Sequence, residues 1–102
     1  MSYSREHARV REAVERAQCT RASPYEVLNC VLETLERVGY AARDARVLDA
    51  DARPAVNSEG ARFIRVEAFR GSDPNTHIFT FALIKFGTTY KPLWLQSAVV
   101  ER

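Results

Sequence analysis

Residues 77–86 (His-Ile-Phe-Thr-Phe-Ala-Leu-Ile-Lys-Phe) carry apolar side chains at successive positions. Side chains alternate between the two faces of a strand, so Phe79 and Phe81 point one way while Ile78 and Ile84 point the other. The helices of a chain of 102 residues can cover only one face of an antiparallel sheet. We therefore expect the second face to need a partner: a second copy, another protein, a ligand or a loop folded back over it.

Helical spacing of apolar residues predicts two helices before the strands. The first is expected over residues 5–19 with Ser4 as its cap, and its apolar side is narrow. The second begins at the capping box Ser23-Pro24-Tyr25-Glu26, in which the Ser hydroxyl and the Glu carboxylate each meet a free backbone N–H. Gly39 is expected to end this helix in a left-handed conformation.

The rest of the chain alternates between apolar and polar residues in short segments separated by turns. In residues 62–70, Ile64, Val66 and Ala68 are expected on one face and Phe63, Arg65, Glu67 and Phe69 on the other. The alternation does not tell which face the helices cover, but the cost of burying Arg65 and Glu67 favours Ile64, Val66 and Ala68 as the inner residues. The predicted fold is α+β, a single domain over residues 1–102, with two N-terminal helices packed on a three- to four-stranded antiparallel sheet. The expected strands are a weak edge strand at 43–51 and a meander of 62–70, 77–86 and 93–100.

Composition and charge add little to this picture. The chain is 46% hydrophobic and 27% charged with a net charge of +2, which is ordinary for a globular protein. No apolar run is long enough to span a membrane, residues 1–20 do not resemble a signal peptide, and two cysteines form no secreted disulfide framework. A cytoplasmic location without membrane contact is therefore expected.

Catalytic and metal sites have weak support in the sequence. Cys30 and His77 could form a nucleophile and base, but a cysteine in an apolar helix is usually buried and inert. A Cys19–Cys30 disulfide fits poorly with two antiparallel helices, so free thiols are expected. Asp49 and Asp51 lack the further oxygen ligands that a cation needs, and no Cys/His cluster has zinc spacing. We expect no enzyme activity, cofactor or metal.

Nucleic-acid binding is the first alternative. Arg5, Arg9 and Arg16 project from one side of the first helix and could follow phosphates, while Phe63 and Phe69 could stack on bases. Against this, Glu12 interrupts the arginines and the total charge is small. A second alternative is a small-ligand or enzymatic pocket between the helices and the sheet.

Aromatic and arginine residues on the sheet predict a protein contact surface, because these residue types dominate interface energies. The candidate interface residues are Phe63, Arg65, Phe69, Phe79, Phe81, Tyr90 and Trp94. The pattern therefore favours a non-catalytic protein-binding module that forms a homodimer or caps a target protein. By analogy with small bacterial and phage chains of this type, an inhibitor, immunity protein or adaptor is expected.

Overall fold

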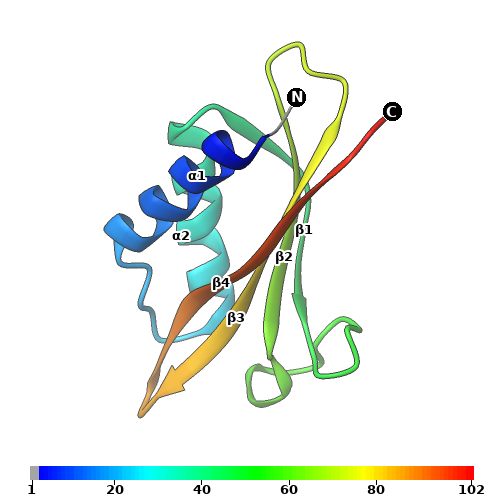
Figure 1. The fold of residues 1–102 in the computed structure, drawn as a ribbon. Coiled ribbons are helices and arrows are strands. Elements are labelled where there is room, and N and C mark those ends of the chain that lie inside the picture. The colour runs from blue at the N-terminus through cyan, green and yellow to red at the C-terminus, as the bar shows by residue number, and fades with distance from the viewer. Residues whose placement is uncertain (1–2) are drawn as a thin grey trace.

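The computed structural model describes residues 3–102 and has two layers, with both helices on one face of a four-stranded sheet (Figure 1). The elements in chain order are α1 (Ser4–Ala17), α2 (Pro24–Arg37), β1 (Tyr40–Leu48), the 3-10 helix η1 (Ser58–Gly60), β2 (Phe63–Arg70), β3 (Thr76–Phe86) and β4 (Thr89–Val100). The strands lie in the order β1-β2-β3-β4, and every neighbouring pair is antiparallel. The predicted α+β class is confirmed.

Helix α2 begins at the predicted position and with the predicted Ser23 cap, whereas α1 differs at both ends. Ser23 Oγ accepts a hydrogen bond from the backbone N–H of Glu26 at 3.2 Å, and Pro24 occupies the first helical position. In α1, Ser4 is the first helical residue rather than the cap, and Tyr3 precedes the helix. The helix ends at Ala17 because Gln18 adopts a positive φ of 50°.

Pairing with neighbouring strands shifts one strand and extends another: β1 has the predicted nine residues but begins and ends three residues earlier, which leaves Asp49 and Asp51 outside it, and β4 is longer than predicted. Strand β1 starts at Tyr40, which pairs with Arg70 of β2, although the sequence of this edge is only weakly strand-like. Strand β4 starts at Thr89, directly after a turn that contains Gly87 at φ +57°. The register shifts within β1 and again within β4, where Leu95 is the additional residue.

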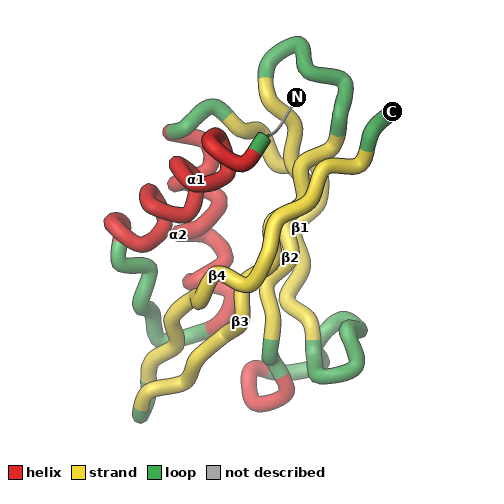
Figure 2. Tube along the Cα trace, viewed as in Figure 1, coloured by secondary structure: helices red, strands yellow, loops and turns green. Residues whose placement is uncertain are grey.

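The hydrophobic core lies between the helices and the sheet, which separate clearly in Figure 2. Alternation along β2 and β3 is regular, and Ile64, Val66 and Ala68 of β2 are buried beneath the helices together with the alternate residues His77, Phe79, Phe81 and Leu83 of β3. Buried core residues of the helices are Val10, Val14, Val27, Leu28, Val31 and Leu35, and those of β2 and β3 are Ile64, Val66, Ala68, Phe79, Phe81 and Leu83. Neither helix is long or apolar enough to span a membrane, within the part of the chain that the structure describes.

Cys19 and Cys30 form a disulfide, which corrects the expectation of free thiols. Their Cα atoms are 5.6 Å apart. The expectation treated Cys19 as part of the first helix, but the helix ends at Ala17 and Cys19 lies in the connection between α1 and α2. Two backbone hydrogen bonds between Arg21 and Tyr90, of 2.9 and 2.7 Å, tie the same connection to the start of β4.

Candidate functional site

The face of the sheet away from the helices carries its side chains in four rows that run across the strands. On β1 and β2 the rows are formed by the pairs Leu48 with Phe63, Arg46 with Arg65, Asp44 with Glu67, and Ala41 with Phe69. The first three rows continue onto β3 and β4 with uncharged residues only, namely Ala82 and Leu93, Thr80 and Gln96, and Ile78 and Ala98. Two charged rows of opposite sign therefore lie side by side between two apolar rows.

Each charged row is stabilised by the neighbouring row of the same molecule. Arg46 Nε lies 2.8 Å from an Asp44 carboxylate oxygen, and the Arg65 guanidinium lies 3.6 Å from Glu67. Within a row, however, like charges are direct cross-strand neighbours, an arrangement that costs free energy. When the order of the rows is reversed, the positive and negative rows exchange places. The surface is therefore complementary in charge to a reversed copy of itself.

A shallow groove of about 700 Å³ crosses the same face. It is lined by Arg46, Leu48, Ala52, Phe63, Arg65, Ile78, Thr80, Leu95, Gln96 and Ala98. Large apolar side chains stay exposed on or beside this face, among them Phe69, Phe86, Leu95 and Val100. Exposed apolar groups gathered on one face are typical of a contact surface.

The structure divides the seven predicted interface residues between the two faces. Phe63, Arg65 and Phe69 lie on the helix-free face, as predicted. The other four are corrected, because they belong to the side that the helices cover. Phe79, Phe81 and Tyr90 are buried in the core, and Trp94 is partly buried with its ring 5.9 Å from that of Phe79 and 5.5 Å from that of Phe81.

The residues suggested for nucleic-acid binding are not brought together. Arg5, Arg9 and Arg16 are exposed on α1, in the helical layer. Phe63 and Phe69 lie on the opposite face of the sheet, so one strand of nucleic acid could not lie across both sets without passing around the sheet. This arrangement does not form the continuous basic and aromatic surface that the alternative requires.

Comparisons with protein-family models, with curated proteins and with solved structures give no match for this chain.

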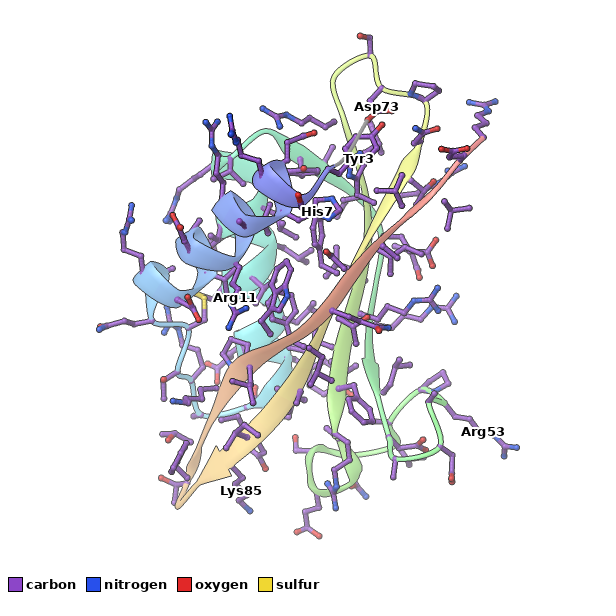
Figure 3. The ribbon with its side chains drawn as sticks, in the orientation of Figure 1. Tyr3, His7, Arg11, Arg53, Asp73 and Lys85 are labelled. Carbon is purple, nitrogen blue, oxygen red and sulfur yellow. A yellow bond between two sulfur atoms is a disulfide. The ribbon has the colours of Figure 1, made fainter. Side chains whose placement is uncertain are left out.

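A second cluster, which sequence analysis did not find, connects α1 to the sheet near the chain termini (Figure 3). His7 Nδ1 lies 2.8 Å from Ser97 Oγ, and His7 Nε2 lies 2.9 Å from His77 Nδ1. His77 Nε2 lies 3.0 Å from a carboxylate oxygen of Asp73. We call Ser97, His7, His77 and Asp73 the polar relay. His77 is fully buried and His7 is 6% exposed, so both rings depend on these bonds.

The direction of hydrogen bonding through the relay follows from its acidic end. A backbone N–H from Asn75 and the contact with His77 hold the pKa of Asp73 below its usual value, so the carboxylate is ionised at neutral pH and only accepts. His77 Nε2 must then donate, which leaves Nδ1 of neutral His77 as an acceptor. His7 therefore donates from Nε2 and accepts at Nδ1, and Ser97 donates to it. This single arrangement of hydrogens gives each of the three bonds one donor and one acceptor.

Further contacts fix the relay in place. The Tyr3 ring stacks on His7 and meets His77 edge-on, with ring centroids 6.0 and 4.9 Å away. On the other side of His7, the Glu6 carboxylate accepts hydrogen bonds from Arg70 and from the Tyr40 hydroxyl. Burial, together with this carboxylate, raises the pKa of Tyr40 to about 12, so its hydroxyl remains a donor.

The pair of Cys30 and His77, which the sequence analysis considered and did not favour, is not formed. Cys30 is held in the disulfide, and His77 bonds to Asp73 and His7 instead. Acyl transfer by Ser97 would require a substrate pocket and donors for an oxyanion, and Ser97 lines neither the groove on the helix-free face nor the other grooves beside α1. Among the described residues, no group of three or more His, Cys, Asp or Glu is arranged to hold a metal ion.

Proposed function

We propose that this chain is a non-catalytic protein-binding module that self-associates through the helix-free face of its sheet. The observation that carries the proposal is the order of the rows on that face: apolar, positive, negative, apolar. A surface that binds its own copy around a two-fold axis must be complementary to itself. This order of rows meets that condition.

The proposed arrangement is two sheets stacked face to face. A two-fold axis between the sheets, running across the strands and midway between the charged rows, reverses the row order in the second copy. Arg65 then faces Glu67 of the second copy, and Phe63 faces Phe69 of the second copy. Stacked sheets of this kind pack about 10 Å apart with interleaved side chains. The charges fix the alignment, while the apolar rows supply most of the affinity.

Charge reversal on this face is expected to weaken the homodimer and then to restore binding between two different variants. A dimer of the Arg65→Glu variant contains two like-charged pairs across the interface. A dimer of the Glu67→Arg variant also contains two. Each variant alone should self-associate about 100-fold more weakly than the unmodified chain, because each like-charged pair costs roughly 1.4 kcal/mol. An equimolar mixture should form a heterodimer, because each variant's reversed residue then meets an opposite charge. Light scattering after size exclusion measures this.

Arg9→Glu is the matched control, since it makes the same charge change on α1, away from the proposed interface. Its dimer affinity should equal that of the unmodified chain. A chain that stays monomeric at high micromolar concentration would overturn self-association. A dimer that is indifferent to both sheet variants would place the interface elsewhere.

A further inference from the structure

We propose that the polar relay is a proton-operated latch, which holds the N-terminal half of α1 on the sheet at neutral pH and releases it in acid. The relay joins α1, the β2–β3 loop, β3 and β4 through one line of hydrogen bonds. It lies on the helix-covered side of the sheet, so this proposal does not depend on self-association.

One additional proton leaves the latch closed. When His7 Nδ1 becomes protonated, the Ser97 hydroxyl rotates and changes from donor to acceptor. The bonds from His7 to His77 and from His77 to Asp73 are unchanged. The positive charge can also move to His77, beside the Asp73 carboxylate, if the proton between the two rings shifts across their 2.9 Å contact. All three bonds survive in either form.

A second additional proton opens the latch. Both ring nitrogens in the His7–His77 contact then carry hydrogen, and no acceptor lies between them. Two positive rings also face each other in a site where water is excluded, with His77 fully buried. Neither ring can turn to water while α1 stays in place, so the contact breaks and the first turns of the helix move away.

The surrounding charges set the direction and the range of this response. The titratable and charged groups that face the two rings are Tyr3 just before α1, Glu6 of α1, Tyr40 of β1, Arg70 of β2 and Asp73 of the β2–β3 loop. Glu6 is itself paired with Arg70, so it offers limited compensation for charge on His7. Burial and the neighbouring His77 lower the pKa of His7 from 6.5, so the folded state favours the neutral ring.

The sign of the pH dependence follows from these shifts. The stabilisation that the neutral latch contributes is complete above pH 6.5 and is lost as the pH falls below it. The pKa of Asp73 lies below 3.8, so the carboxylate stays ionised throughout this range. Opening needs a second proton after His7 has taken up the first, so it is expected at a pH below the one at which His7 becomes charged. It exposes the aromatic rings under His7, of which Phe79 is the nearest, at 5.0 Å between centroids.

Amide hydrogen exchange over pH 7.5 to 4.5 tests the latch, with each rate divided by the intrinsic rate at that pH. Protection of residues 7–12 in α1 is expected to fall about tenfold per pH unit in acid, as for one proton taken up on opening. Protection of α2 serves as the internal reference and should stay constant. The fluorescence of Trp94, the single tryptophan, should change over the same range because its ring contacts Phe79.

Two variants separate proton uptake from a merely structural role. His7→Gln keeps a donor and an acceptor but cannot become charged, so protection of α1 should no longer depend on pH. Ser97→Ala removes the group that accommodates the first proton, so the pH dependence should steepen toward about 100-fold per unit, as for two protons. Unchanged α1 protection down to pH 4.5 in the unmodified chain, or the same pH dependence in His7→Gln, would overturn the latch.

The unmodified chain offers a further test in case His7→Gln fails to fold. Nitrogen-15 spectra of the imidazole rings at pH 7.5 should show hydrogen on Nε2 of both His7 and His77. Hydrogen on Nδ1 of either ring would contradict the bonding order on which the latch is built.

Discussion

Replacing Phe79 with alanine is expected to lower the free energy of unfolding by about 4 kcal/mol, the largest effect we predict for a single side chain. Phe79 is fully buried, and its ring packs against His7, Tyr40 and Trp94 from three different elements. A cavity at this point cannot be closed by the movement of one neighbour. Urea unfolding, followed by circular dichroism, measures the change.

Phe69→Ala is the matched control for that measurement. The same ring is removed from the adjacent strand, but Phe69 is 43% exposed on the helix-free face. Its loss should cost less than about 1 kcal/mol, provided that the protein is dilute enough to be monomeric. Equal costs for the two variants would mean that the two faces of the sheet have been wrongly assigned.

Reducing the Cys19–Cys30 disulfide is expected to lower the free energy of unfolding by about 3 kcal/mol. The bond joins residues separated by 11 positions, and a closed loop of that size restricts the unfolded chain by roughly this amount. Comparing the oxidised and reduced forms of the same chain avoids any change in side-chain volume. Denaturant midpoints with and without a reductant give the difference, and mass spectrometry after alkylation confirms the state of each sample.

A Cys19→Ala, Cys30→Ala double variant supplies an independent measurement. Its stability should lie at or slightly below that of the reduced chain, because Cys19 is buried and its sulfur is lost as well. If the reduced chain unfolds at the same denaturant concentration as the oxidised one, the crosslink does not stabilise the fold. Such a result would contradict the prediction.

The strands that the sequence predicted best are the two at the centre of the sheet. In β2 and β3, alternation runs without interruption, so Ile64 and Val66 could be assigned to the core and Arg65 and Glu67 to the opposite face. That assignment also located the four-row surface, because a charged pair is costly to bury. The order of the rows could not be predicted, since it depends on the register of β1 against β2.

Strand β4 could not be interpreted in the same way because of one additional residue. Counting by alternation from Trp94 places Gln96 on the helix-covered side and Ser97 on the other. The bulge at Leu95 reverses this, so that Ser97 pairs with Phe79 on the inner side. A bulge of this kind has no clear sequence signal in a strand that contains no glycine. The hydroxyl that ends the polar relay was therefore not predictable.

The two histidines were visible in the sequence, but their meeting was not. His7 lies on the apolar side of α1, and His77 lies on the inner face of β3, two residues before Phe79. They are 70 positions apart, and only the packing of α1 across the sheet brings them together. The disulfide escaped prediction for a related reason, since the path of the connection after Ala17 is not encoded by helical periodicity.

Helix α1 is fastened at both ends by bonds of different chemical kinds. The segment after its last turn is tied to α2 by a bond between two sulfur atoms, and its first turns are tied to the sheet by the His7 and Glu6 contacts. One attachment thus responds to electrons and the other to protons. In reducing, neutral surroundings the disulfide is lost while the contacts of the first turns remain, and in oxidising, acidic surroundings the disulfide remains while the latch opens. Reduction and acidification therefore act on opposite ends of the same fourteen residues.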